Sequence, residues 1–179
     1  MNGLLNLSRA IDRLNEGIGR FVLWLVLAAS LVSAFNAVSR YLLGVSSNAM
    51  LEIQWYMFAL IFLLAAGYTL RHDGHVRIDI LYGRLTPRVR AVIDIAGTLL
   101  FLLPMSLLIL WLSLPMVAES IRINEMSPDA GGLLRWPIKL AIPAGFALLS
   151  LQGVSEIIKR IAFLRGQGPL VQERAAEVA

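Results

Sequence analysis

The sequence contains no cysteine, which excludes disulfide bonds, thiolate metal sites and cysteine nucleophiles. Charged residues are also scarce, because they make up only 16% of the 179 residues, whereas a typical soluble domain has roughly 25%. In contrast, 58% of the residues are hydrophobic, and they are gathered in long blocks. This composition excludes a disordered chain and is typical of a protein whose solvent is the lipid bilayer.

Four blocks with few charges are long enough to cross a membrane, since a transmembrane helix needs about 20 mostly apolar residues. We therefore expect an all-α integral membrane protein with a single four-helix transmembrane domain over residues 1–165. Residues 166–179 are expected to form a mobile cytoplasmic tail, because glycine and proline residues interrupt the helix there. The expected transmembrane helices cover about residues 21–40, 52–71, 94–119 and 137–157.

The basic residues outside these spans predict the orientation of the chain in the membrane. Twelve of the 16 lysines and arginines lie on the side that holds both termini, and four lie on the opposite side. Because basic residues concentrate on the cytoplasmic side, both termini are predicted to be cytoplasmic. We attribute the net charge of +4 to these cytoplasmic basic residues, and no nucleic-acid partner is expected.

A helical stripe precedes the first span. The charged residues of the same segment occupy the opposite face of the predicted helix, as in an amphipathic helix. We expect a separate N-terminal helix, which either lies in the cytoplasmic interface of the membrane or packs against a partner protein. The long apolar block that follows favours an uncleaved anchor over a cleaved signal peptide. The stripe consists of Leu4, Leu7, Ile11, Leu14 and Ile18.

The spans hold little that could carry chemistry. No acidic or basic side chain lies in their centres, although a transporter or channel acting alone would need one. The two histidines, His72 and His75, lie in the loop after the second span, so they are not placed as haem ligands within the spans, and no third metal ligand is evident. With no catalytic motif either, we expect neither an enzyme nor a bound cofactor or metal.

Residues suited to packing between helices say more about function than the search for catalytic or metal-binding residues. Small residues that allow helices to approach closely occur in the second span at Gly67 and in the fourth at Ala141 and Gly145. Asn36 in the first span and Gln152 in the fourth offer amides for hydrogen bonds between helices. These residues serve packing either within the bundle or against a partner, which points to a chain that holds another protein.

Residues around the ends of the spans carry a family resemblance. In their order and spacing, the chain resembles the small membrane subunit of tripartite ATP-independent periplasmic (TRAP) transporters, the DctQ-like family, from roughly Leu14 to Leu164. Prolines common in one subgroup, the mannitol/chloroaromatic type, are replaced here by Ala130 and Leu134, and Glu52 is single where the family often has a pair. The resemblance is carried by Asn36, Arg40-Tyr41, Glu52, Gly67, Arg71, the segment 74–79 and the segment 125–139.

The resemblance implies a division of labour in a bacterial inner membrane. A large membrane subunit would move the substrate, driven by a sodium or proton gradient, and a periplasmic binding protein would capture it, usually an organic acid. The small subunit would brace the large one and help to dock the binding protein. The residues then expected at partner contacts are Asn36, Arg40, Glu52, Arg71, His75, Arg77, Asp79, Arg135 and Trp136.

Other interpretations stay open at this point. Arg40 and Glu52 could pair with each other, and the arginines at the inner face could serve only to set the orientation of the chain. A membrane anchor of a redox or enzyme complex is the second functional class, and it predicts a haem or flavin absorbance or a dehydrogenase that co-purifies. A small self-sufficient transporter is the third, and it predicts flux in liposomes that contain this chain alone.

Overall fold

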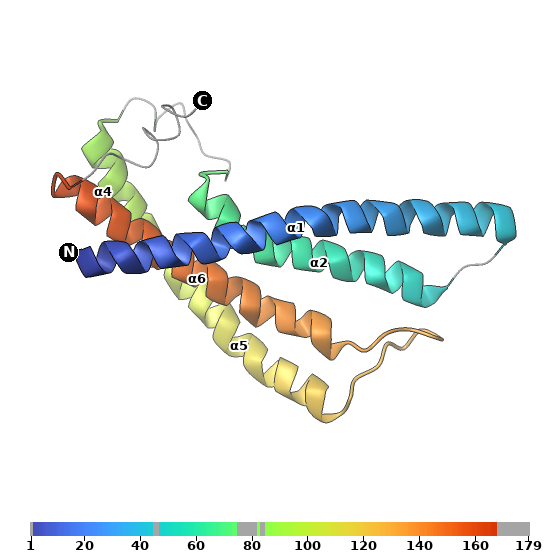
Figure 1. Cartoon of the computed structure of the whole chain (residues 1–179). Helices are drawn as coiled ribbons and strands as arrows, with labels where there is room; N and C mark the ends of the chain where they lie inside the picture. Colours follow the sequence, from blue (N-terminus) through green and yellow to red (C-terminus); the bar gives the residue numbers. More distant parts are fainter. Residues whose placement is uncertain (1, 45–46, 75–81, 83–84, 168–179) are drawn as a thin grey trace.

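The computed structural model describes residues 2–44, 47–74, 82 and 85–167. Over these residues the chain is built of helices (Figure 1). Four helical stretches are long and apolar enough to cross a membrane, which confirms the expected number of spans. The elements are α1 (Asn2–Leu43), α2 (Asn48–Arg71), α4 (Pro87–Gly97), the π-helical turn η1 (Thr98–Leu102), α5 (Leu103–Arg122) and α6 (Trp136–Leu164).

Helix α6 is central to the bundle, because it contacts every other helix that the structure describes. α1 and α2 form one hairpin, α5 and α6 form a second, and the two hairpins diverge toward their connecting loops (Figure 1). α2 packs against both α1 and α6 and so joins the hairpins. We call the end where α1 begins and α6 finishes the N-terminal end, and the end that carries Gly44 and residues 123–135 the hairpin end.

α1 corrects the expectation of a separate N-terminal helix, because it runs without a break from Asn2 to Leu43. At 1.5 Å per residue its length is about 63 Å, roughly twice the thickness of the hydrocarbon core of a bilayer. The apolar stripe predicted on its first half is only partly buried, since Leu4, Leu7 and Leu14 are exposed. The face that is buried instead carries Ser8, Ile11, Asn15 and Gly19.

The interior of the bundle contains many small and polar side chains beside apolar ones such as Val22 and Met57. A Cβ atom built on Gly145 would lie 2.7 Å from the carbonyl oxygen of Leu63, so α2 and α6 approach too closely here for any larger residue. At Gly67, in α2, an added Cβ would collide with the amide of Asn15, which lies on α1. The close packing predicted at Gly67 and Gly145 is therefore found within the chain. Ser106 and Ser150 extend this polar interior, with hydroxyl oxygens 2.8 Å apart.

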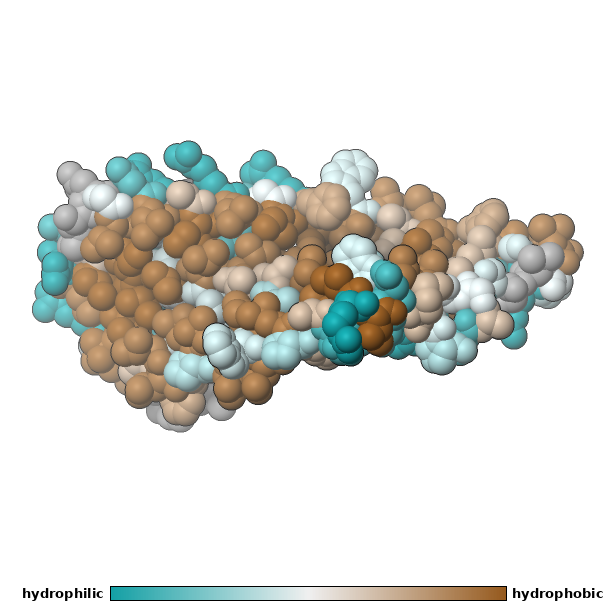
Figure 2. Space-filling view, turned by 90° about the horizontal axis from the view of Figure 1, so that it is seen from below, coloured by the Kyte–Doolittle hydropathy of each residue, from teal (hydrophilic) through white to brown (hydrophobic). Residues whose placement is uncertain are grey.

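The outside of the bundle is apolar. Large side chains such as Phe21 and Trp24 on α1, Phe101 in η1 and Trp111 on α5 are exposed. Figure 2 shows one face covered mostly by hydrophobic residues, with hydrophilic groups gathered at the N-terminal end on its left edge and in a small group near the middle. Such a surface is stable only when lipid or another membrane protein covers it.

Candidate functional site

Charged and strongly polar side chains gather at the two ends of the bundle. At the N-terminal end, Arg160 joins α6 to its neighbours. Its Nε atom donates a hydrogen bond to Asp94 Oδ2 at 2.9 Å, and its Nη1 atom pairs with Glu156 one turn earlier on α6. Asp73, in the turn after α2, lies 4.0 Å away. Arg160 and Glu156 are buried, so losing either partner would leave an uncompensated charge in the bundle.

A second set of contacts attaches the first half of α1 to α6. Asp12 Oδ1 accepts hydrogen bonds from Gln152 Nε2 at 2.9 Å and from Ser155 Oγ at 2.8 Å, and Asp12 Oδ2 lies 3.2 Å from Lys159 Nζ. One turn further along α1, Asn15 Nδ2 donates to Gln152 Oε1 at 2.9 Å. Asn15 and Gln152 are fully buried. These bonds fix the position of α1 along α6, because the polar groups have no water to replace their partners.

Arg71, a predicted partner-contact residue, binds α1 within the chain. Its Nη1 atom donates to the carbonyl oxygen of Asp12 and to Glu16 Oε2, both at 2.7 Å. The neighbouring His72 Nε2 lies 3.0 Å from the same oxygen of Glu16. The end of α2 is thereby bound to the first half of α1. Three further predicted residues, His75, Arg77 and Asp79, lie outside the described residues, so their roles stay predictions.

At the hairpin end, Glu52 organises the loop before α6. The carboxylate accepts a hydrogen bond from the backbone N–H of Leu133 at 2.6 Å and another from the hydroxyl of Ser127. Glu52 is buried, and its partners belong to the loop rather than to Arg40. Arg40 is exposed and has no ion pair with any residue in the described part of the chain.

Further contacts hold the same loop. The Tyr56 hydroxyl donates to the carbonyl oxygen of Leu134 at 2.8 Å, and Lys139 forms an ion pair with Glu125. The Lys139 ammonium keeps the pKa of the Glu125 carboxyl below its usual value. Arg135 bonds Ser127 at 3.4 Å, and its guanidinium carbon lies 5.6 Å from the centre of the Trp55 ring. The loop is therefore a structured surface and not a loose connection.

Two other predicted residues have different surroundings. Trp136 is the first residue of α6 and is half-buried. Asn36 is buried, and its Oδ1 atom has no hydrogen-bond partner among the described residues. An unpaired buried amide oxygen is unusual, because it loses its hydration without compensation.

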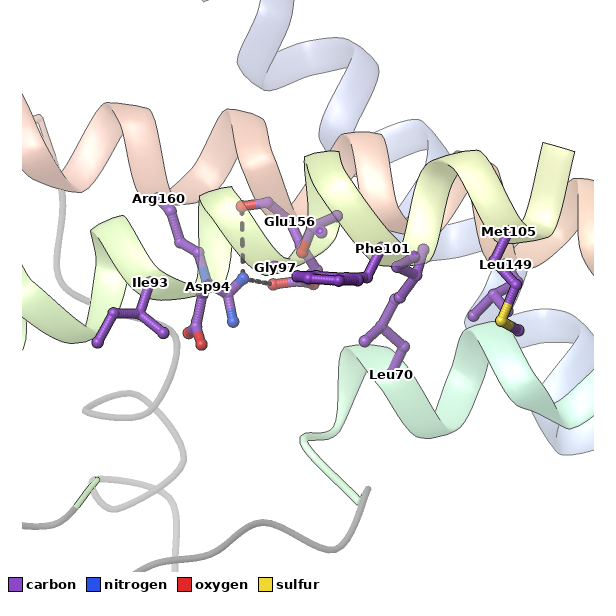
Figure 3. A pocket seen from close by; sticks show the side chains of 11 residues that line it. Leu70, Ile93, Asp94, Gly97, Phe101, Met105, Leu149, Glu156 and Arg160 are labelled. Carbon is purple, nitrogen blue, oxygen red and sulfur yellow. Dashed lines mark hydrogen bonds and ion pairs between the residues drawn. The ribbon is translucent and has the colours of Figure 1, made fainter. Parts of the chain in front are cut away.

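A pocket of about 540 Å³ lies beside the Arg160 cluster (Figure 3). Leu70, Phe101, Met105 and Leu149 line its apolar part, while Glu156 and Arg160 meet at its polar side. The backbone next to it is the π-helical turn η1, which directly precedes α5 and its proline at position 104. Proline lacks the N–H that an α-helix needs, and the widened π-helical turn accommodates the missing hydrogen bond.

Apart from Arg71, the charged residues of the N-terminal end were not singled out as site residues from the sequence. They come from segments far apart in the chain, and their partners depend on how α1 and α4 pack on α6. One local signal was present, because Glu156 and Arg160 are four residues apart on one helix, the spacing of an ion pair. Within the described residues, no group of three His, Cys, Asp or Glu side chains could hold a metal ion. The residues missed were Asp12, Asn15, Asp94, Glu156, Lys159 and Arg160.

Four long apolar helices with an apolar exterior define a multi-pass membrane protein. Comparison with known protein families matches residues 29–163 to "Tripartite ATP-independent periplasmic transporters, DctQ component". The match covers most of the chain, and the chain belongs to this family, that of the small permease component of TRAP transporters. The resemblance given by the span-end residues is thereby confirmed. No curated protein sequence matches the chain.

Proposed function

We propose that the chain is the scaffold subunit of a TRAP-type importer in a bacterial inner membrane. It braces the large membrane subunit and helps to dock a periplasmic substrate-binding protein, and both of its termini are cytoplasmic. The large subunit moves the solute, an organic acid or a similar small molecule, and an ion gradient drives the uptake. Membership of the DctQ family supports the presence of both partners.

One observation carries the scaffold role: charged side chains inside the bundle bind other segments of this chain. Arg160 binds Glu156 and Asp94, Lys159 binds Asp12, and Arg71 binds Glu16. Groups held in this way stiffen the bundle, because moving one helix would break several partly buried ion pairs. A rigid body with an apolar exterior is suited to supporting a partner in the membrane.

The hairpin end supports the docking role. Under the predicted orientation, this end faces the periplasm. Its loop is held by Glu52 and by the Lys139–Glu125 pair, so it presents Met126 and Asp129 on an ordered surface. A surface that is already ordered loses little conformational entropy when a partner binds. Arg40, which is exposed on the same end, and Trp136 are proposed contacts for the partners, together with Asn36 and Arg135.

Affinity purification tests this proposal. The tagged chain is extracted from native membranes in a mild detergent, and the bound proteins are identified by mass spectrometry. We expect a stoichiometric large polytopic membrane protein, and a binding protein that is retained when its solute is added. Recovery of the chain alone, in a detergent that preserves other membrane complexes, would contradict the proposal. A haem or flavin absorbance with a bound dehydrogenase would replace it with the redox-anchor function.

A further inference from the structure

α1 carries a long exposed apolar stripe, which differs from the face that packs inside the bundle. Its members alternate at spacings of four and three residues, so they form the a and d positions of a continuous heptad repeat. Apart from the half-buried Ala28, all of them are exposed. We call this set the α1 seam: Gly3, Leu7, Ala10, Leu14, Gly17, Phe21, Trp24, Ala28, Leu31, Phe35, Val38 and Leu42.

Lipid alone does not account for the α1 seam. Its second half, from Phe21 onward, falls in the predicted span, where lipid tails cover any apolar side chain. Its first half, residues 3–17, lies on the part of α1 that also carries Asp12 and Glu16 and extends beyond that span. A helix about 63 Å long cannot lie entirely in a hydrocarbon core of about 30 Å when it crosses that core. The seam nevertheless stays apolar in both halves.

The glycines of the seam point to close contact with another helix. Gly3 lies in the first turn of α1, and Gly17 lies in its interior, where glycine costs about 1 kcal/mol relative to alanine. A Cβ atom added at either position would meet nothing within 4 Å, so packing inside this chain does not explain them. Together with Ala10 they place one small residue in each heptad, and these small residues alternate along the seam with Leu7 and Leu14. This arrangement lets the backbone of a second helix approach closely.

The residues beside the seam define the chemistry of the partner. Arg13 and Arg20 lie next to it on one side. Arg20 is mostly exposed and lies 3.4 Å from Glu16, and Arg13 has no ion pair among the described residues. On the other side are Leu4, Ile11 and Ile18. Neither side carries an acid, so a second copy of α1 would offer these arginines no carboxylate, whereas a different chain can supply it.

We propose that the α1 seam is the binding surface for one long helix of the large membrane subunit of the transporter. The partner helix packs along α1 as a left-handed pair, because a repeat of 3.5 residues imposes that supercoil. It crosses the membrane beside Leu31 and Phe35 and continues past the N-terminal end. There it carries acidic side chains opposite Arg13 and Arg20. This inference rests on the scaffold function proposed above and names the surface that performs it.

A pair of glycine variants tests the seam with the complete complex. Gly17→Leu fills the space that the partner backbone needs, while Gly97→Leu places the same side chain at another helical glycine with open space around it. The tagged chain is co-expressed with the large subunit, and the yield of the complex is measured. We expect Gly17→Leu to lower the yield about tenfold and Gly97→Leu to leave it unchanged, since overpacking a helix contact weakens binding. Equal yields for both variants would overturn the inference.

Photo-crosslinking separates this inference from the proposed function. A photoreactive residue replaces Leu31 in the seam or, as the control, Leu112 on α5, and both native side chains are 62% exposed. We expect a crosslink to the large subunit from position 31 only. If the wild-type chain binds the large subunit but position 31 crosslinks to lipid or to a second copy, the seam assignment is wrong and the scaffold function stands. If the wild-type chain binds no large subunit, the proposed function fails and the seam assignment with it.

Discussion

Glu52 Oε2 accepts a hydrogen bond from the backbone N–H of Leu133 at 2.6 Å, which joins the N-terminal part of α2 to a loop 81 residues later. The same carboxylate accepts the hydroxyl of Ser127. One buried side chain thus holds the connection that closes the hairpin end. The surface proposed to meet the binding protein depends on this carboxylate for its shape.

Glu52→Gln is expected to loosen this loop. The glutamine amide keeps one oxygen as an acceptor and carries an NH2 donor in place of the other. This donor then faces the N–H of Leu133 or the hydroxyl of Ser127. A lost hydrogen bond to a charged group costs about 1.5–3 kcal/mol, so the Leu133 amide should exchange with solvent at least about tenfold faster. Hydrogen exchange with mass spectrometry measures this. Glu119→Gln is the control, because Glu119 is exposed and pairs with Arg122; equal exchange in both variants would contradict the role of Glu52.

Arg160→Met should destabilise the bundle by about 3–5 kcal/mol, because it leaves the Asp94 carboxylate without its cation and Glu156 with Lys159 alone. Thermal unfolding in detergent, followed by tryptophan fluorescence, measures the loss. Replacing the three residues together with Arg160→Met, Glu156→Leu and Asp94→Leu should restore most of the stability, since a buried ion cluster is often no more stable than a hydrophobic one. A single variant as stable as the wild-type chain would show that the cluster does not hold the helices together.

Gly145→Val should separate α2 from α6. The added carbon atoms would collide with the Leu63 carbonyl, which belongs to the backbone and cannot move aside. We expect a loss of about 1–3 kcal/mol in the free energy of unfolding, the usual cost of overpacking. Gly97→Val provides the comparison, since an added Cβ meets nothing within 4 Å there. The close-packing account fails if the two variants unfold at the same temperature.

The Lys139–Glu125 pair predicts how the hairpin end responds to acid. The pKa of Glu125 is lowered below 4.5 by the Lys139 ammonium. A carboxyl with a lowered folded-state pKa contributes its stability above the unfolded value, and that contribution is lost as the pH falls through the folded value. Proteolysis of the loop should therefore accelerate below pH 4.5. In Glu125→Gln this acceleration should be smaller; an identical pH profile in the variant would assign it to other groups.

The number of spans, the close packing at Gly67 and Gly145 and the family could be predicted from the sequence. These predictions depend on patterns that can be read directly along the sequence. They are blocks of apolar residues, small residues at helical spacing and the order of polar residues at span ends. The continuity of α1 was missed because an amphipathic stripe looks the same whether the next span continues the helix or follows a bend. Gly17 and Gly19 lower helix propensity, but the contacts of Asp12 and Asn15 with α6 outweigh that cost.

The ion pairs at the N-terminal end could not be predicted in the same way. Asp94 lies 66 residues before Arg160, and only the packing of α4 on α6 brings them together. Glu52 shows a related difficulty. The sequence marks it as an acid at a span start that contacts a partner or pairs with Arg40, but its partners are a backbone N–H and a hydroxyl in a distant loop.

Reconstitution in proteoliposomes tests the central claim most directly. Uptake of a labelled solute of the transporter is measured under an imposed ion gradient with this chain alone, with the large subunit alone, with both, and with both plus the binding protein. The scaffold account predicts uptake only in the last sample, and none with this chain alone. Uptake by this chain alone, or equal uptake by the large subunit and binding protein without it, would contradict the account.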